Sequence, residues 1–422
     1  MLRRLVGSEM CIRDSFRIYM INLFNQNRLR KYLYFCFFPL YYFFGLLRGI
    51  GLIPGKYIIY GAAGGSKFID NSKYSFLLNK DKYNCVWITH SSSLARELRL
   101  KGCRAYLSHS IKGVFFQIFA EISVVSHGTF DVIPILLFKV PVIQYWHGCP
   151  IKKIGADVYK NNSNKIGEKI WGLIYILIPH LNNYYSDFFV DNSINMNYGR
   201  TFKPFVSRYL QVPYPRLISL FSELNKEMES IDITIAELIS LKSSGKHIIV
   251  YMPTYREEID ERKKLENQLT ELFKLFSKDD KFVFVYKAHF IVSDIAQTRN
   301  ENILEYTNPD PYPLLEISSA LISDYSSVIF DYMPTKKPLS VFAYDIDLYK
   351  YNPGYYYDIE KLFSSFITRE PLEVYNMLYQ QLINEGSEED DQVNIFNLSL
   401  IHISEPTRLL SIAYAVVCLK KK

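Results

Sequence analysis

The segment ISDYSSVIFDY, residues 322–332, contains the unit from which we expect the whole chain to be built. An apolar strand runs into a polar turn, and the apolar positions that follow suit a helix. Ser326 and Ser327 therefore fall where the helix begins, and there free backbone N–H groups and the positive end of the helix dipole favour a phosphate group. Helix capping by Asp324 or Ser326 uses the same donors and needs no ligand, so both interpretations stay open.

The same alternation of short apolar runs and amphipathic stretches continues on either side of this segment. It is typical of parallel α/β layers, in which strands and helices alternate. The expected strands of the first half are Tyr57–Tyr60, Cys85–Thr89, Ile122–Ser126 and Val140–Trp146. Those of the second half are His247–Met252, Lys281–Tyr286, Ala320–Ser323 and Leu339–Phe342. Each half is thus predicted to form its own Rossmann-like sheet.

A proline-rich stretch separates the two halves. Three prolines fall within residues 204–215, and a charged, helix-like segment follows them. We place the hinge near residues 210–245 and expect an N-terminal domain at 53–215 and a C-terminal domain at 216–397. Two doubly wound domains that face each other leave a cleft at the carboxyl ends of both sheets, where such folds bind ligands.

The segment YWHGCPIKK, residues 145–153, leaves one expected strand and turns sharply. At the carboxyl end of a strand, His147 can enter the cleft as a general base, and Gly148 relaxes the turn behind it. Lys152 and Lys153 are placed to attract an anionic acceptor. The alternatives are a hydrogen-bonded structural histidine and two lysines that are merely solvated.

Two further strand ends carry groups that suit phosphate binding. The segment MPTYR offers the hydroxyl of Thr254 and the guanidinium of Arg256. The segment YKAH delivers Lys287 and His289 to the end of the next expected strand. An ordinary strand-to-loop transition explains either segment on its own, but a second histidine at a strand end, besides His147, favours a shared site.

Several common kinds of site are not indicated. The GAAGG run, residues 61–65, is neither a P-loop nor a dinucleotide fingerprint, and the sequence has no HExxH, no GxSxG and no convincing DxD pair. Cys36, Cys85, Cys103 and Cys149 form no CxxC pair. We therefore predict neither a metal site nor a disulfide framework, and a reducing compartment is the simpler assumption.

Both ends of the chain are expected to be foreign to the natural protein. Residues 1–15 and 398–422 resemble translated sequencing-adapter read-through, and the alternative is a genuine basic N-terminus and C-terminal helix. These two segments carry seven basic and three acidic residues, so without them the formal net charge falls from +6 to +2. A near-neutral chain gives no reason to expect nucleic-acid binding, which calls for a concentrated basic face.

An aromatic run near the N-terminus predicts contact with a membrane. Sixteen uncharged residues lie between Lys31 and Arg48, nine of them Tyr or Phe, with Pro39 near the middle. A spanning helix needs about 20 apolar residues, whereas Tyr between basic flanks favours the headgroup region of an anionic leaflet. We therefore expect residues 16–52 to associate with the membrane surface, and a buried core helix or a spanning segment are the alternatives.

The order of these motifs resembles the CDP-glycerol glycerophosphotransferase family of teichoic-acid priming and polymerising enzymes. The motifs are DNSKY (70–74), VWIT (86–89), HGCPIKKIG (147–155), MPTYR (252–256), YKAH (286–289), SDYSSVIFDY (323–332) and KPLSVFAYDIDLY (337–349). The likeness covers roughly residues 53–363, and the ordered combination is far more specific than any one motif. Cys149 departs from the usual His-Gly-Thr-Pro motif, so the histidine and the turn remain but a hydroxyl donor is lost.

The resemblance implies a GT-B fold with an N-terminal acceptor domain and a C-terminal CDP-donor domain. It also implies a peripheral location on the cytoplasmic face of the bacterial membrane, and transfer of glycerol phosphate from CDP-glycerol to a lipid-linked or polymer acceptor with release of CMP. Carried over by position, His147 is the base for the acceptor hydroxyl. The groups that hold the donor pyrophosphate are His289, Thr254, Ser326 and Ser327, with Asp324 as a further site residue. No cofactor is implied with certainty, and the use of a divalent cation stays open.

Three other functions also stay open. A CDP-ribitol or other polyol-phosphate transferase would use a donor that differs by a few hydroxylated carbons. A nucleotide-sugar glycosyltransferase has the same two-domain fold but releases a nucleoside diphosphate. A non-catalytic, membrane-bound binding protein would keep the cleft without turnover, although the retained histidines argue against it. The sequence indicates neither the number of subunits nor the choice between primase and polymerase.

Overall fold

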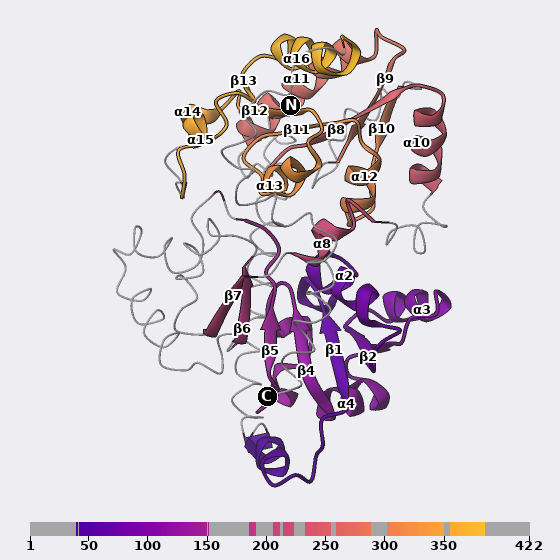
Figure 1. Ribbon diagram of the computed structural model, residues 1–422, viewed down its shortest axis with the longest axis vertical. Helices are drawn as coiled ribbons and strands as arrows, with labels where there is room; N and C mark the ends of the chain where they lie inside the picture. The colour runs from indigo at the N-terminus through magenta and orange to yellow at the C-terminus, as the bar shows by residue number, and fades with distance from the viewer. Residues whose placement is uncertain are drawn as a thin grey trace, which may run out of the picture.

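The computed structural model has two α/β layers, each built on one parallel sheet (Figure 1). It describes residues 39–40, 42–149, 151, 185–190, 206–211, 214–222, 233–254, 259–287, 302–349 and 355–384. The strands of both sheets pair in parallel throughout these residues. Parallel neighbours need a crossover connection, which explains why helices alternate with strands along the chain.

Seven described strands form the first sheet, in the order β3-β2-β1-β4-β5-β6-β7. They are β1 (Tyr57–Gly61), β2 (Cys85–Thr89), β3 (Ala105–Leu107), β4 (Ala120–Val125), β5 (Val142–Gln144), β6 (Tyr185–Val190) and β7 (Val206–Gln211). The helices of this layer are α2 (Asp70–Asn79), α3 (Ser92–Leu100) and α4 (Ile111–Ile118). The strand order reverses between β1 and β4, and the carboxyl ends of two strands leave a crevice at such a switch point.

Six described strands form the second sheet, in the order β10-β9-β8-β11-β12-β13. They are β8 (His247–Met252), β9 (Phe282–Tyr286), β10 (Ile303–Glu305), β11 (Ala320–Ser323), β12 (Leu339–Phe342) and β13 (Ile367–Thr368). The helices after β7 are α8 (Pro215–Ile218), α10 (Ile233–Ser243), α11 (Ile259–Phe276), α12 (Tyr312–Ile317), α13 (Val328–Tyr332), α14 (Ile346–Tyr349), α15 (Ile359–Leu362) and α16 (Pro371–Ile383). This order reverses between β8 and β11, so Met252 and Ser323 lie side by side.

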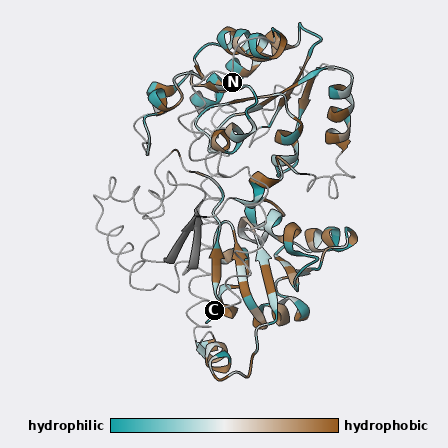
Figure 2. Cartoon of the chain, in the orientation of Figure 1, coloured by the Kyte–Doolittle hydropathy of each residue, from teal (hydrophilic) through white to brown (hydrophobic). Residues whose placement is uncertain are grey.

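Apolar strand residues form the core of each layer, as the colouring of Figure 2 shows. Ile58, Ile59 and Tyr60 of β1 are fully buried, and so are residues 248–251 of β8. Successive side chains of a strand point to opposite faces of the sheet, so a strand that is covered on both faces must be apolar throughout. Removing this apolar surface from water is the main term that stabilises the fold.

Most of the strands expected from the sequence are present. The predicted bounds of β2, β8, β11 and β12 are confirmed. Those of β1 and β9 differ by one residue at one end, and those of β4 and β5 differ by one or two residues at both ends. The sequence did not predict β3, β6, β7, β10 or β13. β7 lies inside the proline-rich stretch that we expected to end the first domain, so this stretch contributes a strand to the first sheet. The exact division of the chain into domains stays a prediction.

The expected membrane-associating segment is described only from residue 39 onward, and residues 42–49 are helical. Four apolar side chains in and beside this helix are between 44% and 61% exposed: Leu40, Tyr42, Phe43 and Leu46. Arg48 ties the helix to the first layer, because its guanidinium donates to the carbonyls of Phe138 at 2.7 Å and Ile118 at 2.5 Å. Within the described ranges, no helix has both the length and the apolar character needed to cross a bilayer.

Helix α2 of the first layer meets the second layer through buried polar contacts. The Lys73 ammonium lies 2.5 Å from the Asp310 carboxylate, and the Tyr74 hydroxyl donates to the same carboxylate at 2.9 Å. Lys73 is 5% exposed and Asp310 is 3% exposed. Each charge has lost its water, so each depends on its partner to offset that loss. These contacts fix the two layers to each other at α2.

Replacing Asp310 by Ala leaves the Lys73 ammonium buried without its counter-charge and the Tyr74 hydroxyl without its acceptor. We expect the free energy of unfolding to fall by about 3–5 kcal/mol. Urea unfolding of Asp310→Ala measures this, with Glu271→Ala as the matched control, because the Glu271–Lys274 pair is more than half exposed and such pairs contribute about 0–1 kcal/mol. Equal losses in the two variants would contradict the assignment of Asp310 to the junction.

Candidate active site

The turn after β5 places His147 between the two layers. Trp146 has a left-handed backbone, with φ at +62°, which is strained for a bulky residue. Two hydrogen bonds hold this conformation: the Trp146 N–H donates to the Gln144 side chain at 3.0 Å, and the Asn71 amide donates to the Trp146 carbonyl at 3.0 Å. The left-handed residue ends the strand, so the expected strand at residues 140–146 is shortened to β5.

The hydrogen bond of His147 fixes its tautomer. Its Nδ1 lies 3.4 Å from the carbonyl oxygen of Ser126, and since a carbonyl can only accept, Nδ1 carries the proton. Nε2 therefore keeps its lone pair. Desolvation by the surrounding protein, with a smaller contribution from His127, lowers the pKa of His147. More than a third of the residue is exposed to solvent, which limits this effect. At neutral pH the ring is uncharged, as a general base requires.

A second histidine, His127, stacks on His147. The ring centroids are 4.3 Å apart and the ring planes differ by 4°. Nδ1 of His127 accepts the backbone N–H of Ala63 at 3.0 Å, so the ring proton is on Nε2, which lies 3.3 Å from the Asp70 carboxylate. Burial lowers the pKa of His127 to about 4, and this ring is neutral as well.

The GAAGG run, residues 61–65, lies against the His127 loop. The Asp131 carboxylate connects them by accepting four backbone N–H groups, those of Gly64 (2.7 Å), Ser126 (3.0 Å), His127 (2.9 Å) and Gly128 (3.3 Å). Burial raises the pKa of Asp131 to about 6, and the four N–H groups oppose this rise. The glycine-rich run thus helps to shape the site through its backbone, without the sequence of a P-loop.

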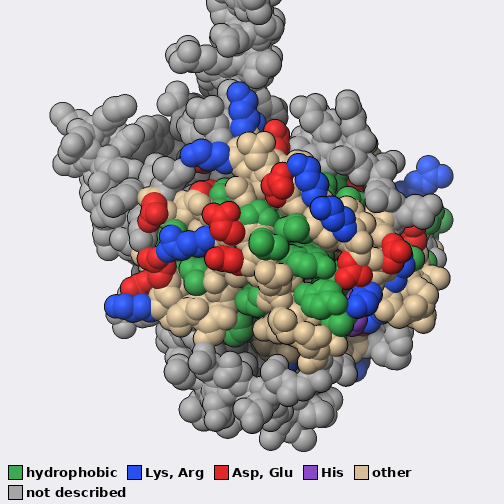
Figure 3. Space-filling model, turned by 90° about the horizontal axis from the view of Figure 1, so that it is seen from above, with side chains coloured by type: hydrophobic (Ala, Val, Ile, Leu, Met, Phe, Trp, Pro, Cys, Tyr) green, Lys and Arg blue, Asp and Glu red, His purple; other side chains and the backbone are tan. Residues whose placement is uncertain are grey.

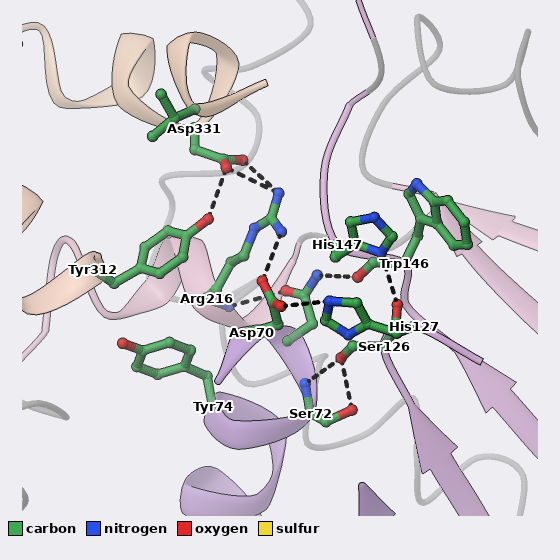
Figure 4. A network of polar contacts seen from close by, with 12 residues as sticks. Asp70, Ser72, Tyr74, Ser126, His127, Trp146, His147, Arg216, Tyr312 and Asp331 are labelled. Carbon is green, nitrogen blue, oxygen red and sulfur yellow. Dashed lines mark hydrogen bonds and ion pairs between the residues drawn. The ribbon is translucent and has the colours of Figure 1, made fainter. Parts of the chain in front are cut away.

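Arg216 of α8 joins the two layers at this point (Figure 4). Its guanidinium lies 2.9 Å from the Asp331 carboxylate of α13 and 3.5 Å from the Asp70 carboxylate of α2. The Tyr312 hydroxyl donates to Asp331 at 2.7 Å. Burial raises the pKa of Asp70 to about 6, and the positive charge of Arg216 partly offsets this rise. The two carboxylates and the guanidinium therefore form one charge network around the His127–His147 pair.

Segments from the two layers approach each other closely at Gly148. A Cβ atom at this position would lie 2.5 Å from the Ser327 hydroxyl oxygen, which is closer than side-chain contacts allow. The structure therefore brings together two segments that the sequence analysis selected separately, the turn at His147 and the Ser326–Ser327 pair. Cys149, which follows, is buried and forms no disulfide bond within the described part of the chain.

The segments after β8 and β11 are bound to each other through Asp324. Its carboxylate accepts the backbone N–H of Thr254 at 2.8 Å, that of Tyr325 at 2.6 Å, and the Thr254 hydroxyl. Asp324 is fully buried, so it holds Thr254 in place. Helix α13 begins at Val328, directly after Ser327, as the sequence predicted.

The remaining site residues predicted from the sequence are less fully described. Lys287 follows β9, where its ammonium donates to the Asn308 carbonyl and lies 5.1 Å from the Tyr306 ring centroid. Lys152, Lys153, Arg256 and His289 lie outside the described residues. Within the described part of the chain, no group of three or more His, Cys, Asp or Glu side chains could hold a metal ion.

Four residues of the network were missed by the sequence analysis: Asp70, His127, Arg216 and Asp331. Three of them had a usable signal. Asp70 and Asp331 lie inside motifs that were quoted for other reasons, and His127 directly follows an expected strand, the criterion that selected His147. Arg216 had no such signal, because its partners lie more than 100 positions away in the sequence.

The chain matches a known family over most of its length. A family model described as CDP-glycerol:poly(glycerophosphate) glycerophosphotransferase matches residues 47–404. The teichoic acid poly(glycerol phosphate) polymerase of Bacillus spizizenii is 29% identical over 350 residues, which cover 75% of this chain and 82% of that protein. The protein of the same name from Staphylococcus epidermidis is 28% identical over 325 residues, and the match covers 72% of this chain but only 42% of that relative.

Two solved structures share the fold. The wall teichoic acid polymerase TagF matches with a TM-score of 0.67 at 21% identity, over 95% of this chain and 98% of that chain. A UDP-GlcNAc 2-epimerase from Neisseria meningitidis matches with a TM-score of 0.50 at 13% identity, over 87% of this chain and 100% of that chain. At these identities the likeness concerns the fold alone. The α/β, GT-B-like fold with parallel sheets is confirmed.

The lowered pKa of His127 makes stability depend on pH. An unfolded imidazole binds a proton below about pH 6.5, whereas the folded pKa is about 4. The contribution of neutral His127 is therefore complete above pH 6.5 and is lost as the pH falls toward 4. Urea unfolding should show the free-energy difference between wild type and His127→Phe shrinking by about 1–2 kcal/mol from pH 7 to pH 5.

Asp70 and Asp131 change the pH dependence of stability in the opposite direction from His127, because their pKa values are raised in the folded protein. Both carboxyl groups are present in wild type and in His127→Phe, so the difference between the two proteins isolates the histidine. A difference that stays constant from pH 7 to pH 5 would contradict the neutral, buried state of His127.

Proposed function

The chain belongs to the CDP-glycerol:poly(glycerophosphate) glycerophosphotransferase family, and on this basis we propose that it transfers glycerol phosphate from CDP-glycerol to a hydroxyl group of a lipid-linked or surface-polymer acceptor. CMP is the second product, and the polymer is of the teichoic-acid or capsule type. The observation that carries this proposal is the free Nε2 lone pair of His147, next to the close approach between Gly148 and Ser327 of the second layer.

The reaction follows from the position of that lone pair. The acceptor hydroxyl gives its proton to Nε2 of His147, and the hydroxyl oxygen attacks the β-phosphorus of the donor. The bond from this phosphorus to the bridging oxygen breaks, the electron pair stays on the α-phosphate, and CMP leaves. His147 then returns the proton to solvent and is ready for another acceptor.

The donor pyrophosphate is held by the second layer. The hydroxyls of Ser326 and Ser327 provide hydrogen-bond donors, and Asp324 holds Thr254 at the same site by accepting both its backbone N–H and its hydroxyl. Three basic side chains balance the charge that accumulates on the phosphoryl oxygens: Arg256, Lys287 and His289. Lys152 and Lys153 attract the phosphates of the acceptor. A divalent cation remains compatible with this scheme.

CDP-ribitol is the second candidate donor. A teichoic acid poly(ribitol-phosphate) polymerase of Bacillus spizizenii is 27% identical to this chain over 194 residues, alongside the glycerol-phosphate enzymes. Both donors present the same CMP and β-phosphate to the site, and only the polyol differs. Release of CMP also separates this reaction class from a nucleotide-sugar glycosyltransferase, which leaves a nucleoside diphosphate.

We predict that His147→Ala lowers acceptor-dependent CMP release by about 100- to 10,000-fold, the usual contribution of a general base. Residues 16–397 are incubated with CDP-glycerol or CDP-ribitol and a lipid-linked acceptor, with and without EDTA, and CMP is quantified. Affinity for the donor should be largely unchanged, because His147 acts on the acceptor. Undiminished turnover in His147→Ala removes this residue from the mechanism, and no CMP from wild type with either donor refutes the proposed reaction.

Variants of the donor side provide the matched control in the same assay. Ser327→Ala removes a hydrogen bond to a charged phosphate and is expected to raise the KM for the donor by about 10-fold or more, with a smaller effect on turnover than His147→Ala. An unchanged donor KM would take Ser327 out of the donor site.

The enzyme works at the cytoplasmic face of the membrane as a peripheral protein. The exposed apolar side chains of the 42–49 helix support this location, since single Leu and Phe side chains gain about 1.5–3 kcal/mol on full burial. The opposite end of the molecule differs. There, charged side chains of both signs surround the apolar ones on the α16 face (Figure 3), which suits contact with water. A lipid-linked acceptor would be confined to the same surface as the helix.

Substituting Phe43 and Leu46 by Glu should lower binding to anionic vesicles by about 10-fold or more, because apolar contacts are lost and two negative charges are added. Co-sedimentation with vesicles of phosphatidylglycerol and phosphatidylcholine measures this. Leu372→Glu on α16 is the matched control, since Leu372 is similarly exposed at the far end of the molecule. Full binding by the double variant would place the membrane contact elsewhere in the protein.

A further inference from the structure

His127 is a partly buried side chain with both ring nitrogens in contact, and the proposed reaction gives it no task. It lies two residues after the end of β4, next to Ser126, whose carbonyl accepts the His147 Nδ1 proton. Both ring nitrogens of His127 have partners, Ala63 on one side and Asp70 on the other. With its lone pair occupied by the Ala63 N–H, His127 is not available as a base for the acceptor.

The two partners clamp the edges of the ring. The Ala63 N–H and the Asp70 carboxylate lie at its two nitrogens, so rotation of the ring would break both contacts. Ala63 and Asp70 both have left-handed backbones, with φ at +51° and +61°. Such conformations are costly for residues other than glycine, and they persist only where surrounding contacts enforce them. The strained backbone at both contacting residues, Ala63 and Asp70, indicates that the orientation of the His127 ring is strictly determined.

Desolvation is the main cause that keeps the pair neutral, and the charges around it add to this effect. Arg216 and Lys67 both disfavour a proton on His127, and Arg216 also disfavours one on His147. Asp70 favours a proton on His147, but desolvation and the neighbouring imidazole outweigh it. Two neutral rings can stack at 4.3 Å without repulsion, whereas two charged rings could not.

We propose that His127 is a positioning residue that fixes the plane of the His147 ring and, together with the Ser126 carbonyl, aims Nε2 of His147 at the acceptor hydroxyl. This inference rests on the proposed function, in which His147 is the base. One loop thus determines both the tautomer and the orientation of the His147 ring: the Ser126 carbonyl selects the tautomer, and the His127 ring sets the ring plane. The Asp131 carboxylate, which accepts the N–H groups of Ser126 and His127, holds that loop rigid.

The charge of Asp70 contributes to the same arrangement of His127 and His147. When His147 accepts the proton from the acceptor hydroxyl, it becomes an imidazolium. The Asp70 carboxylate, which lies at the edge of the stacked His127 ring, stabilises that charge without a direct bond. Arg216 keeps Asp70 ionised by lying against its other oxygen. The negative charge is therefore in place before the reaction begins, and no residue has to move to supply it.

The test compares His127→Phe, which keeps a flat ring against His147 but loses both edge contacts, with His127→Ala, which removes the ring. We expect kcat to fall about 10- to 100-fold in His127→Ala, because misaligned reacting groups cost about this much. The loss of kcat should be smaller in His127→Phe, and the KM for CDP-glycerol should be unchanged in both variants. His109→Ala is the control and keeps full activity, since His109 is exposed and lies outside the network.

A second readout does not depend on turnover. Long-range proton–nitrogen NMR spectra of histidine-labelled, ligand-free protein report which ring nitrogen is protonated, and His147→Ala identifies the His147 signals. Wild type should show a proton on Nδ1 of His147. In His127→Ala the His147 ring is free to turn away from the Ser126 carbonyl, so a mixture of both tautomers is expected. If wild type releases no CMP, the proposed function fails, while these spectra still decide the positioning role.

Three results would overturn the inference. The first is full kcat in His127→Ala. The second is an equal loss of kcat in His127→Ala and His127→Phe with the His147 tautomer unchanged, which would mean a purely structural role. The third is a donor KM that rises in step with the loss of kcat, which would place His127 on the donor side of the site.

Discussion

The buried guanidinium of Arg216 makes the contact on which the arrangement of the site depends. It lies on α8 between the two sheets, is 1% exposed, and bridges Asp70 of the first layer to Asp331 of the second. Burial disfavours its charge, but the neighbouring carboxylates outweigh burial and raise its pKa. Losing either carboxylate while the site stays closed would leave a charge that is poorly compensated and away from water, so Arg216 needs partners from both layers.

Both sides of the candidate site are ordered by this one bridge. On the first side, Asp70 lies at the edge of His127, which in turn stacks on His147. On the second side, Asp331 lies one helical turn after Ser327 in the segment proposed to hold the donor phosphates. A phosphoryl transfer needs its base and its phosphate-binding groups in register, and here a single ion-pair network sets that register.

The sequence predicted the parts of the molecule that are encoded locally. Long apolar strands such as β8 and the residues at their ends, among them His147 and Ser327, follow from the alternation of strand and helix. Short strands such as β13, with two residues, carry too little pattern to be found. The network around Arg216 was also out of reach, because its partners lie 146 and 115 positions away and charge patterns do not pair residues over such separations.

The close approach at Gly148 bears on how such enzymes can diversify. The cores of the two layers are not independent, because one buried apolar cluster includes Tyr60 of β1 and Val250 of β8. Residues where the two layers meet are constrained most directly. A side chain gained at position 148 must be matched by a change at Ser327, and a charge lost at Asp331 by a change at Arg216. If two related enzymes exchanged one layer, the hybrid would therefore depend more on whether the residues at this contact fit each other than on how similar the two sequences are overall.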